Sequence, residues 1–148
     1  MSAEQMSIAG KWCDAEDGAT ADILNPATGQ VMANTPKATL NDVNRCVDAS
    51  RAAFEDPSWK AMDPAQRGRI LNKMAQATYA KAKELAAIES NNNGKTFREA
   101  LSEIRYGAWT LEYFAGLSDK IEGSTIPVPG NRLNYTLRQP LGVTVHIV

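Results

Sequence analysis

The last six residues, 143–148, constrain the fold more than any other segment of the chain. They form an almost unbroken apolar, β-branched run with no turn and no following element. Such a run is typical of a strand buried on both faces of a parallel sheet. Parallel strands need crossover connections of a dozen or more residues, and none follows here. We therefore expect these 148 residues to be the front part of a longer protein.

Composition and charge exclude several classes of function. The 16 basic and 17 acidic residues give a formal net charge of −1, without the basic face that nucleic-acid binding needs. No apolar stretch is long enough for a membrane span, and the first residues lack the features of a signal peptide. Cys13 and Cys46 are too few for a disulfide framework. We expect a globular, cytoplasmic protein with no nucleic-acid or membrane partner.

Local signals divide the chain into a strand region and a helical region. Residues 1–38 contain short apolar pieces separated by turn signals, which predicts a small antiparallel β meander. Thr39 and Asp42 are spaced as in a capping box, which indicates a helix start. A second start follows at Asp63 and Pro64, and Gly94 is suited to end that helix in a left-handed conformation. We expect a break within it between residues 79 and 83.

A third helix is predicted from about residue 97 to residue 121, closing at Gly123. One side carries apolar residues, and roughly the opposite side carries Ser102, Tyr106, Trp109 and Tyr113. Aromatic residues on a second face predict contact with another subunit, another domain or a ligand channel. Two glycines in this helix, at positions 107 and 116, suggest close approach of a neighbouring backbone.

Beyond Gly123 the chain is predicted to be extended. Residues 133–137 alternate between apolar and polar side chains, as in a half-exposed strand. His146 is the only histidine and lies inside the terminal apolar run, where we expect a neutral, hydrogen-bonded side chain at a sheet face. The glycines are too scattered for a phosphate-binding G-x-G-x-x-G loop. Neither cysteine is predicted to be a nucleophile, because Cys46 lies on an apolar helix stripe and Cys13 lies beside acidic residues.

Five motifs follow one another in a characteristic order: Ile8-Ala9-Gly10-Lys11-Trp12, Asn25-Pro26-Ala27-Thr28-Gly29, Glu89 through Gly94-Lys95, Tyr113-Phe114-Ala115-Gly116, and Arg138-Gln139-Pro140-Leu141-Gly142-Val143. Each motif alone is weak, but together they cover nearly the whole chain. In this order the chain resembles the N-terminal portion of the NAD(P)-dependent aldehyde dehydrogenase superfamily, of the betaine aldehyde dehydrogenase kind.

The resemblance implies an α/β fold in four parts. Residues 1–38 form a short β meander, and residues 39–123 form three long helices of the cofactor-binding domain. Residues 124–141 contain the oligomerisation strand. Residues 142–148 form a buried first strand towards the Rossmann-like domain and the missing catalytic loop. A dimer or homotetramer is implied.

The resemblance also implies the chemistry of the complete enzyme, an oxidoreductase that converts an aldehyde to a carboxylic acid with NAD or NADP. The nucleophilic cysteine, the glutamate base and the glycine motif of the family lie downstream, so no catalytic residue is expected here and the chain alone is predicted to be inactive. Ile147 and Val148 are implied at the edge of the dinucleotide pocket. Tyr106 is implied in the aldehyde channel, with Ser102 and Trp109 as further candidates; packing against the rest of the protomer is the alternative role of this face.

Some family members hold a monovalent cation. The matching positions here are Ile23 and Leu24, through backbone oxygens, and Asn92, where the family has an aspartate. An amide oxygen can coordinate a hard cation, although an asparagine that satisfies a helix end is the alternative.

Two alternatives to the enzyme remain open. The first is a truncated product that acts as a non-catalytic interaction module, dimerising or pairing its exposed strand edges with a partner. The second is a helical scaffold whose aromatic face binds a peptide, which leaves the terminal run unexplained. A reading frame that continues into Pro-Trp-Asn after residue 148 would favour the enzyme.

Overall fold

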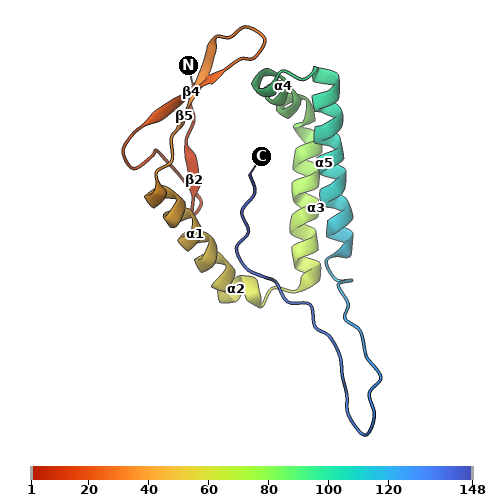
Figure 1. Cartoon of the computed structure of the whole chain (residues 1–148). Helices are drawn as coiled ribbons and strands as arrows, with labels where there is room; N and C mark the ends of the chain where they lie inside the picture. Colours follow the sequence, from red (N-terminus) through yellow and green to blue (C-terminus); the bar gives the residue numbers. More distant parts are fainter. Residues whose placement is uncertain (1, 148) are drawn as a thin grey trace.

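Short strands precede helices in the computed structural model, which describes residues 2–147 (Figure 1). A three-stranded sheet has the order β1-β5-β4, in which β4 and β5 are antiparallel and β1 runs parallel to β5. A separate hairpin pairs β2 with β3. The predicted short antiparallel strands are confirmed, but they belong to two sheets and not to one meander, and β1 is added in parallel. The strands are β1 (Ser2–Ala3), β2 (Met6–Ile8), β3 (Lys11–Cys13), β4 (Thr20–Leu24) and β5 (Val31–Pro36).

The helices begin and end where side chains can satisfy their terminal backbone groups. Thr39 and Asp42 form the predicted capping box of α1, and Asp63 caps α3 with Pro64 in its first turn. The expected break separates α3 from α4, and Gly94 ends α4 at a φ of 81°. The helices are α1 (Leu40–Glu55), α2 (Pro57–Lys60), α3 (Pro64–Ala80), α4 (Ala82–Asn93) and α5 (Phe97–Leu117).

Small residues hold α3, α4 and α5 together. The buried side chains of this bundle are alanines, at positions 75, 82, 86, 100 and 108. At Gly68 on α3, an added Cβ would lie 2.6 Å from the carbonyl oxygen of Ala115 on α5. The expectation that a neighbouring backbone approaches Gly107 and Gly116 closely is wrong. Among the described residues, a Cβ added at either glycine would meet no atom within 4 Å.

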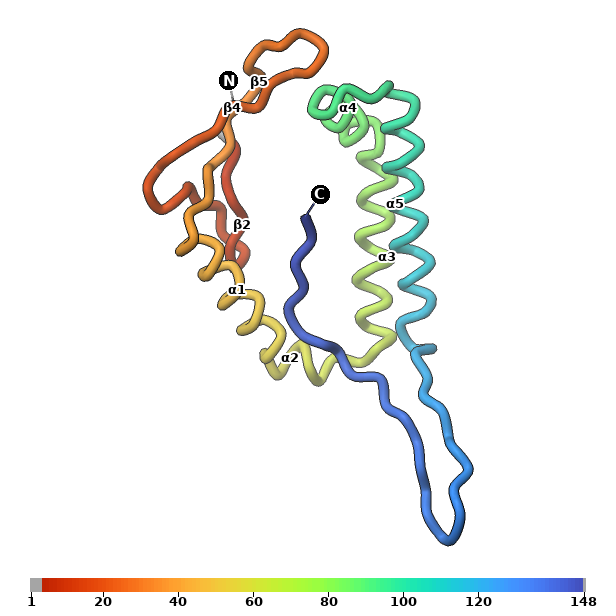
Figure 2. The backbone as a smooth tube through the Cα atoms, in the orientation of Figure 1, coloured from red at the N-terminus to blue at the C-terminus, as the bar shows by residue number. Residues whose placement is uncertain are grey.

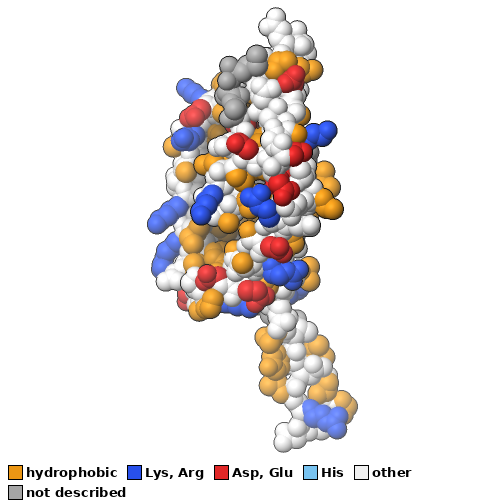
Figure 3. All heavy atoms as spheres, turned by 90° about the vertical axis from the view of Figure 1, so that its left-hand side faces the viewer, with side chains coloured by type: hydrophobic (Ala, Val, Ile, Leu, Met, Phe, Trp, Pro, Cys, Tyr) orange, Lys and Arg blue, Asp and Glu red, His pale blue; other side chains and the backbone are white. Residues whose placement is uncertain are grey.

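The extended segment after α5 differs from the prediction. Helix α5 ends at Leu117, short of residue 121, and residues 133–137 do not form a strand. One isolated antiparallel bridge between Thr125 and Tyr135, formed by two backbone hydrogen bonds, closes this segment into a projecting arm (Figure 1). The alternating pattern predicted a strand. A strand needs a partner that continues the ladder of hydrogen bonds, and within the described residues the pairing does not extend beyond the single bridge at Tyr135. Apolar side chains cover much of the arm (Figure 3).

The terminal run rises between α1 and α3 without joining a sheet (Figure 2). Val145 is 76% exposed and Ile147 is 95% exposed. The expectation of a buried strand is therefore wrong for residues 143–147, because no described strand lies beside them to pair with their backbone. Val148 lies outside the described residues. None of the described helices is long and apolar enough to cross a membrane.

Candidate functional site

Four aromatic residues in the second half of α5 form a continuous ladder along an exposed face of the helix. The ring centroids of Tyr106 and Trp109 are 5.5 Å apart, and those of Trp109 and Tyr113 are 5.8 Å apart, both stacked. The Tyr113 ring then meets Phe114 edge-on at 5.4 Å. All four side chains are exposed, as is Ser102 one turn earlier. The predicted aromatic face therefore exists, and it offers stacking surface to an apolar ligand or partner.

The residues predicted for the cation site come from two segments that the fold brings together. Ile23 and Leu24 lie at the end of β4, and Asn92 lies in the last turn of α4. The turn after β4 touches the end of α4, because a Cβ on Gly94 would lie 2.9 Å from Cγ of Pro26. Among the described residues, no group of three or more histidine, cysteine, aspartate or glutamate side chains could hold a metal ion.

Asn93, not Asn92, satisfies the end of α4. Its Oδ1 accepts from the backbone N–H of Lys95 at 3.0 Å, and its Nδ2 donates to Oε1 of Glu89 at 2.6 Å. Asn92 is exposed. The alternative role considered for Asn92, satisfying the helix end, is therefore filled by Asn93, which supplies the local side-chain hydrogen bonds at this terminus.

Lys95 forms an ion cluster that the sequence pattern did not predict. Its Nζ pairs with the Glu103 carboxylate on α5 and lies 3.3 Å from Oε1 of Glu89 on α4. The hydrogen bond to Glu103, and then the one to Glu89, raise the pKa of Lys95 above its ordinary value. The cluster ties the α4–α5 connection to both helices, directly beside the Asn-Pro turn. The sequence feature that could have indicated this cluster is Glu89 near the end of one helix, followed by Gly94-Lys95 at the start of the connection to the next.

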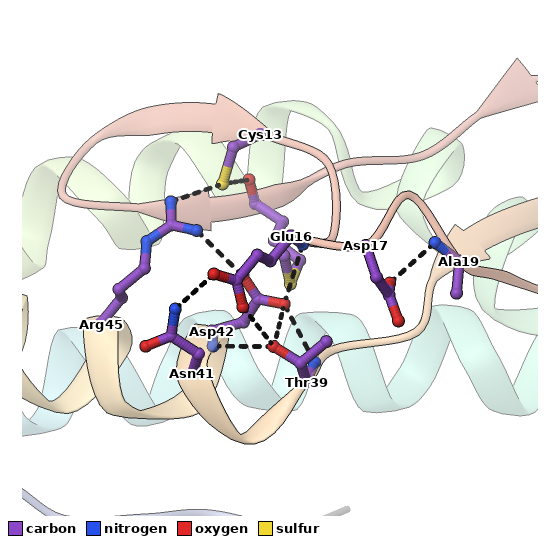
Figure 4. Close-up of polar contacts among 9 residues, drawn as sticks. Cys13, Glu16, Asp17, Ala19, Thr39, Asn41, Asp42 and Arg45 are labelled. Carbon is purple, nitrogen blue, oxygen red and sulfur yellow. Dashed lines mark hydrogen bonds and ion pairs between the residues drawn. The ribbon is translucent and has the colours of Figure 1, made fainter.

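Asp42 is buried where the strand region meets α1 (Figure 4). Its Oδ2 accepts from the backbone N–H of Thr39 at 2.9 Å and of Glu16 at 3.1 Å, and Arg45 Nη1 donates to Oδ1 at 2.9 Å. The hydrogen bond from the Thr39 backbone, and then that from Glu16, lower the pKa of Asp42. A capping residue predicted from local spacing thus also joins two distant segments.

Both cysteines are free and half-buried. Cys13 Sγ lies 3.7 Å from the Met6 carbonyl oxygen, and Nη2 of Arg45 approaches it to 4.0 Å (Figure 4). Cys46 lies on α1 and lines an apolar cavity of about 300 Å³ together with the terminal run.

His146 and Ile147 lie in the terminal run, far along the chain from α1 but close to it in space. His146 lines the same cavity as Cys46, and its Nε2 lies 3.4 Å from the Thr144 hydroxyl. The side chain is exposed, so the expected position at a sheet face is wrong for the described structure. Ile147 is also exposed. The fold thus separates the aromatic face of α5, the turn beside α4 and the terminal run into three places.

The chain belongs to the aldehyde dehydrogenase family, whose profile matches residues 12–148. The fold is the N-terminal part of the aldehyde dehydrogenase fold, with mixed helices and short strands. Its structural neighbours include an NAD-dependent aldehyde dehydrogenase from Sinorhizobium meliloti, which matches with a TM-score of 0.81 and 38% identity over 87% of this chain and 26% of that one.

Three similar proteins illustrate the match. A (Z)-2-((N-methylformamido)methylene)-5-hydroxybutyrolactone dehydrogenase from Acinetobacter baylyi is 45% identical over 97% of this chain and 29% of its own length. An aldehyde dehydrogenase from Bacillus cereus matches with a TM-score of 0.86 and 36% identity, over 90% of this chain and 28% of that one. Betaine aldehyde dehydrogenase from Staphylococcus aureus, solved in complex with NAD+, matches with a TM-score of 0.79 and 31% identity, over 85% and 25%. The chain thus spans less than a third of the length of these proteins.

Proposed function

We propose that this chain is the N-terminal part of an enzyme that oxidises an aldehyde to a carboxylic acid with NAD or NADP. The observation that carries the proposal is the family match over residues 12–148, together with coverage of only 29% of the Acinetobacter relative. The NAD+ complex of the Staphylococcus neighbour supports NAD as the cofactor. The aldehyde itself would be the partner of the longer enzyme, and the remainder of the polypeptide the partner of this chain.

The chain by itself is proposed to be inactive. Aldehyde oxidation of this kind needs a thiolate nucleophile, donors for the oxyanion, a hydride acceptor and a base. Cys13 Sγ meets a carbonyl oxygen and an arginine. Cys46 lines an apolar cavity together with His146, but within the described residues the imidazole hydrogen-bonds to Thr144 and not to this thiol. We accordingly assign no catalytic residue here.

A dinucleotide would need more than these residues to hold it. The sequence has no glycine-rich phosphate loop. Of the two residues implied at the dinucleotide pocket, the described one, Ile147, is exposed and offers apolar contact. We propose Ile147 and Val148 at the edge of the dinucleotide pocket of the longer enzyme, where a Rossmann-like domain would supply the phosphate contacts. The chemistry that NAD supplies when bound is acceptance of a hydride.

The aromatic face of α5 is proposed to line the aldehyde channel. Tyr106 is the leading residue, because it is the most exposed ring of the ladder and stacks on Trp109. Ser102, one turn away, can offer a hydroxyl to a polar group. Such a surface would orient an apolar aldehyde by contact and exclude water from it.

Further parts of the proposal concern assembly, location and ions. The exposed apolar side chains of the projecting arm support an oligomerisation role in a dimer or homotetramer. Two free cysteines support a reducing, cytoplasmic location. The contact between Pro26 and Gly94 supports a monovalent-cation site formed by Ile23, Leu24 and Asn92 in the longer enzyme.

Turnover measurements test the central proposal. The purified 148-residue chain mixed with an aldehyde and NAD should produce no reduced-nicotinamide absorbance, whereas the product of a reading frame that continues into Pro-Trp-Asn should produce it. Turnover by the 148-residue chain would contradict the proposal that it is inactive by itself. A dimeric short chain whose gene ends after residue 148 would instead support the interaction module.

A further inference from the structure

An apolar cavity with one positively charged side chain, Arg67, in its wall lies where α2, α3 and the segment after α5 meet. Its volume is about 300 Å³, and its walls include Trp59, Ile70, Leu71, Met74 and Ile121. The polar side chains in the wall are Arg67 and Ser118. The Ser118 hydroxyl already donates to the Phe114 carbonyl oxygen at 3.1 Å, as helix serines often do. Arg67 therefore determines which polar group the cavity can accept.

The guanidinium of Arg67 is held in place but only partly satisfied. Its Nη2 donates to the carbonyl oxygens of Met62 at 3.0 Å and Trp59 at 3.4 Å, and its central carbon lies 5.5 Å from the centre of the Trp59 ring. Nε is buried, and no described residue accepts a hydrogen bond from it. No described carboxylate lies within ion-pair distance of Arg67. Burial of an unmatched donor on a cation is costly.

A carboxylate is the group that this arginine fits. A guanidinium presents its donors in a planar fork that matches the two oxygens of a carboxylate. The apolar walls exclude a strongly hydrated free anion, because they offer it no further donors. The complementary ligand therefore carries its carboxylate between apolar groups.

The extent of the apolar surface points to a polypeptide. Trp59 is 43% exposed and Ile121 is 70% exposed, and Ile70 and Met74 are also exposed beside the cavity. A patch that continues beyond a cavity is typical of a protein contact. The similar proteins carry more than two thirds of their length outside the part that this chain matches. In an enzyme of that length, the remaining polypeptide could supply the segment that covers this cavity.

We propose that this cavity receives an acidic side chain carried on an otherwise apolar polypeptide segment, and that Arg67 binds its carboxylate. The source of the segment, the remainder of an aldehyde dehydrogenase polypeptide, rests on the proposed function. The binding chemistry rests on the cavity alone.

A titration of the 148-residue chain with matched peptides tests the proposal. Trp12→Phe and Trp109→Phe leave Trp59 as the only tryptophan reporter. Acetyl-Leu-Glu-Leu-amide should change its fluorescence saturably, and acetyl-Leu-Gln-Leu-amide should bind about tenfold more weakly. Arg67→Gln should weaken binding of the glutamate peptide by a similar factor, and Arg69→Gln, which changes the exposed arginine two residues away, should leave it unchanged.

Three outcomes would overturn the proposal: equal binding of the two peptides, equal loss in both arginine variants, or equally tight binding of free 3-phenylpropionate, which would make this a small-molecule site. If Arg67→Gln does not fold, the salt dependence of glutamate-peptide binding to the tryptophan-reporter chain decides, because an ion pair weakens with ionic strength. Because this experiment measures binding and not turnover, its failure would not bear on the proposed oxidoreductase function, which the turnover assay tests separately.

Discussion

Ala115 on α5 directs its carbonyl oxygen at Gly68 on α3, so that a Cβ on Gly68 would lie only 2.6 Å from it. The neighbouring atom is backbone, which cannot rotate away. We expect Gly68→Ala to lower the free energy of unfolding by about 1–3 kcal/mol, the usual cost of overpacking. Urea denaturation of the purified chain measures this, and an unchanged midpoint would contradict the contact.

Gly107→Ala provides the opposite prediction in the same bundle. Gly107 lies inside α5, and a Cβ there meets nothing within 4 Å. Because alanine restricts the unfolded chain and favours helix, the free energy of unfolding should rise by about 0.5–1 kcal/mol. The same denaturation experiment applies. Destabilisation by this substitution would show that α5 has an unseen close neighbour at this point.

Acid should loosen the junction between the strand region and α1. The pKa of Asp42 is lowered from its ordinary value of 3.8, chiefly by the Thr39 backbone hydrogen bond. A lowered folded-state pKa contributes stability above pH 3.8 and loses it as the pH falls through the folded value. Asp42→Ala should therefore destabilise the chain near neutral pH and flatten the fall in stability below pH 3.8.

Unfolding midpoints measured across the acidic range, with Asp48→Ala as control, check this expectation. Asp48 is an exposed aspartate on the same helix. A pH profile of Asp42→Ala identical to that of the parent chain would remove Asp42 as the group responsible.

Thr96 caps α5 and should matter more than hydroxyls further along the helix. Its side chain accepts from the Glu99 backbone, while the Glu99 carboxylate accepts from the Thr96 backbone. Thr96→Ala should cost about 1 kcal/mol of unfolding free energy. Ser102→Ala, at an exposed position inside the helix, should stay within about 0.5 kcal/mol of the parent. Comparable losses at both sites would mean that the cap contributes nothing special.

Tyr106→Ala tests the proposed substrate face in the longer enzyme. We expect kcat/KM for a bulky aromatic aldehyde to fall by about tenfold, while that for a small aldehyde changes less, because only the larger substrate loses ring contact. The unfolding midpoint should change little, since Tyr106 is 67% exposed. Tyr79→Ala, a tyrosine on α3, is the control. A uniform fall for all aldehydes would argue against a channel role.

Local sequence determined where α1 and α3 begin and where α4 ends, but not where α5 ends. The capping box at Thr39, the Asp63-Pro64 start and the left-handed Gly94 were all predictable, because each depends on hydrogen bonds or φ preferences within a few residues. The aromatic ladder followed in the same way from helical spacing. The order of short motifs was enough to indicate the family, which the comparisons confirm.

Only the tertiary structure decided that Gly68 permits close packing, that the buried Nε of Arg67 has no acceptor among the described residues, and that the apolar run 143–147 does not become a strand. Gly68 contacts Ala115, Arg67 lies in a cavity with Ile121, and residues 143–147 run without a ladder. Each outcome depends on atoms brought together from distant parts of the chain. Neither spacing nor propensity carries that information, because the same glycine, arginine or valine run is satisfied or unsatisfied according to the neighbour that folding places beside it.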